Sequence, residues 1–355
     1  MVTSPRWKNR PEGSTWGDFG PDDELGRLNL VTPHKVMQGI AEVQIGKSFC
    51  LSLPLDYPGG NIINPRRHPP ELRPTQRNGL PNFNYRLQCD DPTALDVVCD
   101  DAVLLTLQYS TQWDTLAHVG QMFDADGDGV PEAVYYNGFR ANEDIVSTVV
   151  YDADGKAVPS GKAPDGKHVG ARRLGVENMA ASCVQGRGVM IDLLAHFGRS
   201  GKSVGYEDLM MVLEKDHVKV EEGDFVLLRT GFDRALLGMN KNPDPKELFA
   251  TTSALNGRDP RLQQWVTDTG LVALISDNYA VESTPAEPCM EAFCAHLPLH
   301  AHCLFKLGVY LGEMWLLSDL ADWLRENDRS RFLFTAPPLR LPGAVGSPAT
   351  GVATV

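Results

Sequence analysis

Nearly continuous runs of apolar residues recur along the chain, and stretches with helical patterning separate them. The runs predict strands at 188–192, 225–230, 271–275 and 309–311, with shorter ones at 49–53 and 103–107. Helical patterns fall at 206–216, 259–268, 297–307 and 316–326, and Thr32-Pro33 predicts the start of a helix that runs to about Val43. Apolar strands that alternate with helices are typical of a sheet covered by helices, so we predict an α/β fold.

The first third of the chain lacks this periodicity. Residues 1–35 are rich in Gly, Pro and Trp, and residues 54–81 form a stretch rich in Pro, Arg and Asn that predicts a long loop. Loops of that length usually form lids, rims or oligomer contacts. We therefore expect residues 1–95 to form an N-terminal arm and long Pro-rich loop, and residues 96–355 to form the main catalytic domain, within one integrated unit.

Composition and charge narrow the possible partners. The 355 residues include 33 Lys and Arg against 46 Asp and Glu, a formal net charge of −13, and 42% of them are hydrophobic. A chain of this length buries roughly three quarters of its unfolded surface, so a metal would serve chemistry rather than folding. The negative charge argues against nucleic acid and anionic membranes as partners, and no apolar run approaches the roughly 20 residues that span a bilayer.

The cysteines and the N-terminal sequence bear on the compartment. Seven cysteines are scattered along the chain without a CxxC pair. Residues 1–8 lead into polar sequence rather than into the apolar core of a signal peptide. We therefore expect a cytoplasmic protein whose thiols are reduced and mostly buried.

A polar segment follows the short apolar run near the end of the first third. Gln108, Ser110, Gln112 and Asp114 share one parity, so in an extended chain their side chains point to one face, and His118 continues that parity. Such a polar face is costly to bury without partners. This makes it a candidate site, with a solvated strand edge as the alternative interpretation.

The end of a later strand adds two further candidates. His300 lies in a predicted helix that ends at Gly308, and Glu313 follows the short strand after it. Both could join Asp114 as ligands of a divalent ion such as Zn²⁺ or Mn²⁺. A helix-capping histidine and a surface glutamate are the alternative.

Other polar motifs carry weaker signals. Asp277 and Glu282 follow the strand at 271–275, either as carboxylates that support a site or as loop acids. Residues 124–129 imitate the start of a calcium loop, but Tyr135 stands where a bidentate Glu is required, so a turn is the default. Candidate nucleophiles without a supporting motif are Ser110, Ser182, Cys183 and Cys303.

The chain resembles the metal-dependent cyclase family, which includes kynurenine formamidase, isatin hydrolase and trans-dienelactone hydrolase-like proteins. The family signature His-x-Gly-Thr-His-x-Asp-x-Pro-x-His falls on residues 108–118. There Thr111, Asp114 and His118 match, and Gln108 and Gln112 replace two histidines. Further matching segments are Trp16-Gly17…Gly20…Asp23…Gly26-Arg27-Leu28-Asn29, Arg187–Asp192, Leu228–Gly231, His300…Gly308…Glu313 and Pro337-Pro338-Leu339…Gly343…Gly346-Ser347-Pro348.

This resemblance implies a swivelling β/β/α domain with a mixed sheet and a β-barrel-like core. It implies that Asp114, His300 and Glu313 are metal ligands, and we add Gln112 to them. It also implies that His118 is the catalytic general acid/base. Because a Gln carbonyl binds zinc more weakly than imidazole does, we expect one divalent ion, Zn or Mn, rather than two.

On this basis we predict a metal-dependent hydrolase that opens a lactone or a cyclic or N-formyl amide. We expect Trp113, Gln108 and Asp277 to contact the small carbonyl substrate, and the family resemblance implies a homodimer or homotetramer. Two alternatives stay open. One is a non-catalytic small-molecule binding protein with a degenerate metal site, and the other is a metal-independent hydrolase that uses a Cys or Ser.

Overall fold

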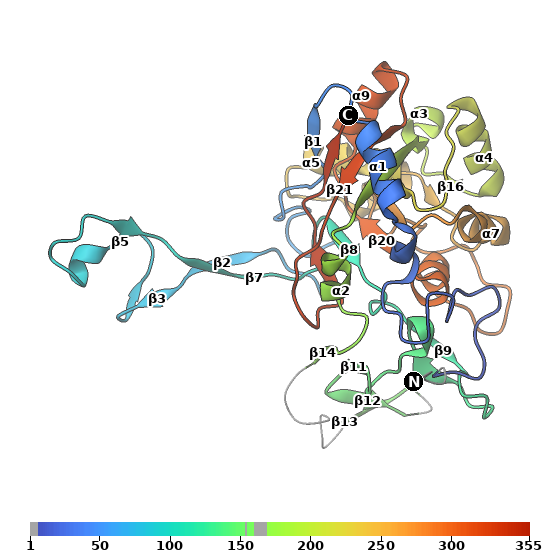
Figure 1. The fold of residues 1–355 in the computed structure, drawn as a ribbon, viewed down its shortest axis with the longest axis horizontal. Helices are drawn as coiled ribbons and strands as arrows, with labels where there is room; N and C mark the ends of the chain where they lie inside the picture. Colours follow the sequence, from blue (N-terminus) through green and yellow to red (C-terminus); the bar gives the residue numbers. More distant parts are fainter. Residues whose placement is uncertain (1–5, 153–154, 160–168) are drawn as a thin grey trace.

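The computed structural model describes residues 6–152, 155–159 and 169–355. Its central feature is a mixed sheet of nine strands, strongly curled into a half barrel (Figure 1). The order across the sheet is β1 (Ser48–Cys50), β23 (Val352–Thr354), β21 (Arg331–Thr335), β15 (Gln185–Asp192), β17 (Phe225–Arg229), β19 (Ala273–Ser276), β20 (Tyr310–Glu313), β8 (Gln112–Asp114) and β22 (Gly346–Pro348). The predicted α/β fold with a mixed sheet and a barrel-like core is confirmed.

The centre of the sheet is parallel and its flanks are antiparallel. β15, β17, β19 and β20 pair in parallel, and every residue of β17, β19 and β20 is buried. Burial on both faces explains the continuous apolar runs in the sequence. β8 pairs antiparallel with both β20 and β22. It therefore brings residues 112–114 next to the last parallel strand.

Helices pack around the sheet. They are α1 (Pro33–Ala41), α2 (Val176–Ala181), α3 (Leu193–Phe197), α4 (Tyr206–Lys215), α5 (Phe232–Gly238), α6 (Pro245–Thr251), α7 (Pro260–Thr269), α8 (Pro298–His300) and α9 (Ser318–Glu326), with the shorter turns η1 (Gly26–Leu30), η2 (Leu87–Cys89) and η3 (Tyr136–Gly138) and the π-helical segment η5 (Ala301–Leu307). α1 contacts β15 and β21, and α4 contacts β15 and α7. The Thr32 hydroxyl caps α1 by accepting a hydrogen bond from Lys35 N, as the sequence predicts. None of the helices in the described ranges is both long and apolar enough to cross a membrane.

A long arm, residues 71–104, projects from the body at the left of Figure 1. Its stem pairs β2 (Glu71–Pro74) with β7 (Asp101–Leu104), and its outer part contains the ribbons β3 (Gln76–Arg77)–β4 (Leu80–Pro81) and β5 (Tyr85–Arg86)–β6 (Val97–Val98). The loop predicted for residues 54–81 is therefore wrong from residue 71 onward. The apolar run at 103–107 contributes to this arm rather than to the main sheet.

Four more two-stranded ribbons complete the described strands. They are β9 (Gln121–Phe123)–β10 (Glu132–Val134), β11 (Ile145–Val146)–β14 (Gly170–Ala171), β12 (Val149–Tyr151)–β13 (Ala157–Pro159) and β16 (Ser203–Val204)–β18 (Ala254–Leu255). The calcium-like segment leads from β9 to β10. Its Asp124 carboxylate accepts hydrogen bonds from the backbone of Gly127, Asp128 and Gly129, which is the behaviour of an Asp/Gly turn.

The sequence predicts reduced, mostly buried thiols, and the structure shows that this prediction is wrong. Cys289 and Cys294, five residues apart in the sequence, form a disulfide. The exposed free cysteines are Cys50, Cys89, Cys99 and Cys183, whereas Cys303 is buried.

The N-terminal segment packs against η5, which directly follows His300. The buried Trp16 indole contacts the Phe305 ring edge to face and donates a hydrogen bond to Phe305 O at 2.8 Å. Arg27 N donates to Gly308 O, also at 2.8 Å. Trp16 and Arg27 therefore support the segment that carries His300. The division of the chain at residue 95 stays a prediction.

We expect Gly308→Ala to destabilise this contact strongly. Gly308 has a φ of 64°, and a Cβ added there would lie 2.7 Å from Gly26 Cα. Left-handed strain and overpacking together should lower the free energy of unfolding by about 2–4 kcal/mol in urea denaturation. The control is Gly238→Ala at the exposed end of α5, where a Cβ meets no atom within 4 Å. Equal effects of the two substitutions would contradict this account.

Candidate metal centre

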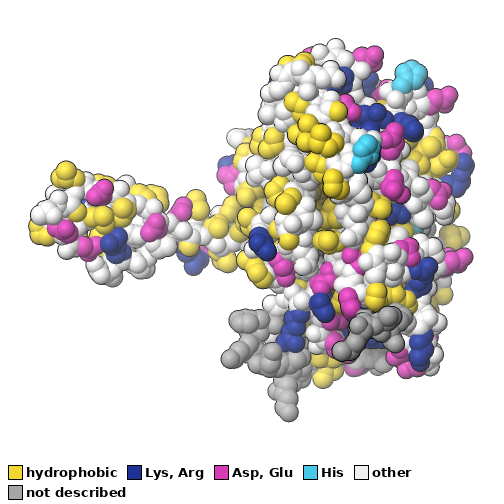
Figure 2. Space-filling model, in the orientation of Figure 1, with side chains coloured by type: hydrophobic (Ala, Val, Ile, Leu, Met, Phe, Trp, Pro, Cys, Tyr) yellow, Lys and Arg dark blue, Asp and Glu magenta, His cyan; other side chains and the backbone are white. Residues whose placement is uncertain are grey.

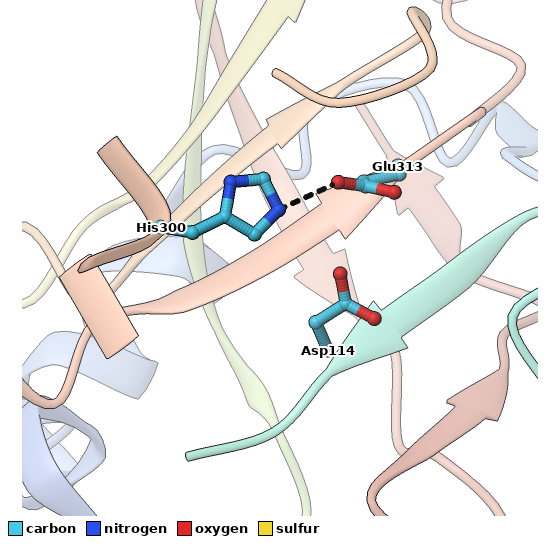
Figure 3. Close-up of side chains that lie close together, drawn as sticks. All are labelled: Asp114, His300 and Glu313. Atoms are coloured by element: carbon cyan, nitrogen blue, oxygen red, sulfur yellow. Dashed lines mark hydrogen bonds and ion pairs between the residues drawn. The ribbon is translucent and has the colours of Figure 1, made fainter. Parts of the chain in front are cut away.

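Two neighbouring antiparallel strands bring carboxylates together. In the β8–β20 pairing Gln112 lies opposite Glu313, and Leu311 lies opposite Asp114, so all four side chains share one face of the sheet. His300, at the end of α8, points its ring toward the same place (Figure 3). Possible ligand atoms of Asp114, His300 and Glu313 all lie within 4.8 Å of one another.

Glu282 fixes the His300 ring. Its Oε1 accepts hydrogen bonds from His300 Nδ1 at 2.7 Å and from His300 N at 3.0 Å, and its Oε2 accepts one from Leu299 N at 2.9 Å. His300 Nε2 is thereby directed at Glu313 Oε1, 3.1 Å away. A histidine whose second ring nitrogen is held by a carboxylate is typical of metal sites.

Three buried carboxylates surround this single imidazole. Burial alone would lower the pKa of His300, but hydrogen bonds to Glu282 and Glu313 outweigh it and raise the pKa to about 10. Burial and the charge of Asp114 raise the pKa of Glu313 to about 7, against the influence of His300. The centre therefore favours positive charge, and a metal ion that binds there would release protons.

The polar atoms of Asp114 are only partly satisfied. Its Oδ1 accepts a hydrogen bond from Gln112 Nε2 at 3.1 Å, and the same nitrogen donates to Glu313 Oε2 at 3.0 Å. Asp114 Oδ2 is buried and has no hydrogen-bond partner among the described residues. An unpaired buried carboxylate oxygen is costly. Two carboxylates and one imidazole form a donor set that suits Zn²⁺ or Mn²⁺, so these residues fit a divalent ion.

His118 and Arg67 border the centre. His118 Nε2 lies 3.7 Å from Asp114 Oδ1, and its side chain is 21% exposed. Burial lowers the pKa of His118 in spite of the Asp114 charge, and the nearby His300 and Arg67 lower it further. Arg67 Nη1 donates to Gln112 Oε1 at 3.5 Å. The centre thus has a neutral imidazole and a guanidinium at its margin.

The cyclase family model matches residues 50–283, well over half of the chain. The chain belongs to the cyclase family. The predicted family is confirmed. None of the curated proteins compared with the chain matches it.

Several solved structures share this cyclase fold. A novel cyclase is 28% identical, with a TM-score of 0.70 over 97% of this chain and 100% of its own. Isatin hydrolase A from Labrenzia aggregata, bound to benzyl benzoate, is 13% identical, with a TM-score of 0.52 over 90% of this chain and 97% of its own. An isatin hydrolase bound to the product analogue thioisatinate is 14% identical, with a TM-score of 0.51 over 91% of this chain and 99% of its own. At such low identities the two isatin hydrolases show the fold alone.

The structure brings together the residues that the family resemblance predicts as ligands. Asp114, His300 and Glu313 converge, and His118 lies beside them. Gln112 is also in place, but it turns its amide nitrogen, not its oxygen, toward the two carboxylates. The metal-binding role of Gln112 and the catalytic role of His118 stay predictions.

Two of the three residues predicted to bind substrate are fully buried and hydrogen-bonded to other parts of the chain. Trp113 alternates to the other face of β8, is fully buried and donates through Nε1 to Ala336 O at 2.9 Å. Asp277 is fully buried, and its Oδ1 accepts hydrogen bonds from Thr230 N and Thr230 Oγ1 at 2.7 Å. Gln108 is half-buried. The contacts of Trp113 and Asp277 give no support to substrate binding, which stays a prediction.

At this cyclase centre, the contacts of two residues become evident only from the three-dimensional structure. Glu282, which the sequence leaves open as a supporting carboxylate or a loop acid, supports His300 directly. Arg67 is missed by the sequence analysis, because the Arg-rich stretch around it marks no single residue.

We expect Glu282→Gln to weaken binding of Zn²⁺ or Mn²⁺ by about 10–100-fold, because the His300 ring loses its charged partner. Competition with a chromophoric chelator measures the affinity. Glu287→Gln is the matched control, since Glu287 lies exposed in the same loop region. Unchanged affinity in Glu282→Gln would show that the ring needs no such support.

Proposed function

We propose that this cyclase-family chain is a metal-dependent hydrolase that opens a lactone or a cyclic or N-formyl amide. The proposal rests on the convergence of Asp114, His300 and Glu313 within 4.8 Å, with one buried carboxylate oxygen left unpaired. Two proteins of similar fold are isatin hydrolases, and one of them holds a product analogue. This likeness supports hydrolysis of a small carbonyl compound.

Different side chains would perform different parts of such a reaction. Asp114, His300 and Glu313 would hold one Zn²⁺ or Mn²⁺, and Glu282 would keep His300 oriented. When bound, the ion supplies Lewis-acid polarisation of a carbonyl group and makes water more acidic. Burial of the ligands keeps bulk water away from them, which strengthens their electrostatic interactions.

We assign the proton transfer to His118, whose Nε2 lies 3.7 Å from Asp114 Oδ1. Its neutral ring can accept a proton from water at Nε2 and deliver it to the departing oxygen or nitrogen of the substrate. Proton transfer of this kind is worth about 10²–10⁴-fold in rate. Hydrolysis creates a carboxylate, and the guanidinium of Arg67 at the margin of the centre suits that negative charge.

The metal requirement tests the proposal. We expect about one equivalent of Zn²⁺ or Mn²⁺ per chain, and less than about a third of an equivalent in Glu313→Ala, because one of three protein ligands is lost. Metal analysis measures the content, and hydrolysis of lactones and N-formyl arylamines should stop on chelation and return with the ion. Glu326→Ala, at the exposed end of α9, is the control.

We expect His118→Ala to lower turnover at least about a hundredfold while the metal content stays unchanged. The ring touches no predicted ligand at hydrogen-bond distance, so its loss should affect proton transfer and leave the ion in place. His34→Ala, an exposed residue of α1, controls for nonspecific effects. Activity close to that of the parent chain would remove the role proposed for His118.

One observation favours a second candidate, the non-catalytic binding protein. The Gln112 amide donates to Asp114 and Glu313 together, so it already offsets part of their negative charge. A chain that takes up neither Zn²⁺ nor Mn²⁺ would support this alternative. The metal-independent thiol hydrolase is less favoured, because burial raises the pKa of Cys303 far above its usual range. The cytoplasmic location stays a prediction.

A further inference from the structure

Arg67 is held in a defined position between the candidate metal centre and an aromatic ring. Its guanidinium lies over the ring of Tyr279, 5.7 Å from the ring centre, and its Nη1 donates to Gln112 Oε1 at 3.5 Å. The electric field of this cation reaches both His118 and Glu313. Arg67 therefore directs its charge at the residues of the centre.

One buried asparagine fixes the turn that carries this guanidinium. Asn64 O accepts a hydrogen bond from Arg67 N at 3.0 Å, and Asn64 Oδ1 accepts one from Arg66 N at 3.1 Å. Asn64 Nδ2 donates to the Tyr279 hydroxyl at 2.8 Å, and Phe249 contacts the Tyr279 ring edge to face. The backbone of Arg67 and the ring beneath its side chain are thus tied to the same residue. A cation that is ordered before a ligand arrives loses less entropy on binding.

Most of the hydrogen-bonding capacity of this guanidinium is unused among the described residues. A guanidinium offers five N–H donors in a planar fork, and one of them is taken up, by Gln112 at the long distance of 3.5 Å. None of the ion pairs within the described ranges involves Arg67. Arg67 also borders a small hollow with Ile63, Tyr109 and Tyr279, so packing does not seal it. Its free donors match the two oxygens of a carboxylate.

The rest of the surface does not gather anions. The chain has a formal net charge of −13, and the face drawn in Figure 2 shows Lys and Arg side chains scattered among Asp and Glu rather than collected in a broad basic patch. Such a surface repels an anionic compound at long range. Preference for an anion must therefore come from short-range contacts with an ordered cation, and Arg67 supplies one beside the centre.

We propose that Arg67 is a specificity-determining residue that binds a carboxylate already present on the substrate. This inference rests on the proposed hydrolase function and narrows its substrates to lactones or amides that carry a carboxylate close to the bond that is opened. The carboxylate would accept two hydrogen bonds from the guanidinium while the reacting carbonyl faces the centre. Attachment at two points fixes the orientation of the substrate, which favours attack on the carbonyl.

A matched pair of compounds tests this preference. N-formyl arylamines with a ring carboxylate are compared with the same compounds carrying a neutral ring carboxamide. The parent chain should show a kcat/KM at least about tenfold higher for the carboxylate, as expected for charge-assisted hydrogen bonds. In Arg67→Met the ratio of the two kcat/KM values should fall to about one, chiefly through a higher KM for the carboxylate. Any help that Arg67 gives to the carboxylate formed in the reaction affects both compounds equally and cancels in this ratio.

Arg66→Met is the matched control, because Arg66 is the exposed neighbour of Arg67 on the same turn. It should keep the preference of the parent chain. Arg67→Lys retains the charge but loses the planar fork, so it should keep only part of the preference. A parent chain without the preference already overturns the inference, whatever the variants do.

Binding of benzoate separates this inference from the hydrolase activity itself. Isothermal calorimetry measures the affinity of the parent chain and of both methionine variants for benzoate and for neutral benzamide. The benzoate dissociation constant should rise at least about tenfold in Arg67→Met and stay unchanged in Arg66→Met. Benzoate binding that depends on Arg67, in a chain that hydrolyses neither compound, would overturn the proposed function and keep Arg67 as a carboxylate-binding residue. Hydrolysis without preference for the carboxylate, or unchanged benzoate affinity in Arg67→Met, would overturn this inference and leave the hydrolase in place.

Discussion

The candidate centre is built around an excess of negative charge that the fold buries. Asp114, Glu282 and Glu313 lie away from water around the single imidazole of His300. Buried carboxylates are tolerated only with compensating positive charge or donors, and here one Asp114 oxygen has no hydrogen-bond partner within the described residues. If stability were the only requirement at this position, apolar side chains would serve better than a carboxylate with an unpaired oxygen. The imbalance is therefore the physical reason why Asp114, His300 and Glu313 could hold a cation.

Segments far apart in the chain produce that imbalance. β8 inserts next to the parallel core and sets Gln112 opposite Glu313, while the loop after β19 supplies Glu282. The N-terminal segment stabilises the arrangement from outside, because Trp16 packs on η5 directly after His300. Geometry at the centre thus rests on packing that no single element provides.

This dependence explains what the sequence could and could not predict. β15, β17 and β19 are buried on both faces, so their apolar runs identify them without any knowledge of their neighbours. The short strands β8 and β22 carry little periodicity, and their pairing is decided by tertiary contacts. The strand end before Glu313 suggested His300 and Glu313 as partners of Asp114, but their spacing is no general metal motif, so it was the family resemblance that favoured a metal site over a capping histidine and a surface glutamate. The contacts of Trp113 and the place of Arg67 required coordinates.

The arm and the metal centre are physically connected through the chain between Asn64 and the first stem strand. Asn64 Nδ2 donates to the Tyr279 hydroxyl at 2.8 Å, Arg67 reaches Gln112, and His68 N donates to Thr106 Oγ1 at 3.2 Å. Only three residues separate Arg67 from the start of β2 at Glu71. Arg67 therefore owes its position beside Gln112 to a short connection whose ends are held by the Tyr279 hydroxyl and by Thr106.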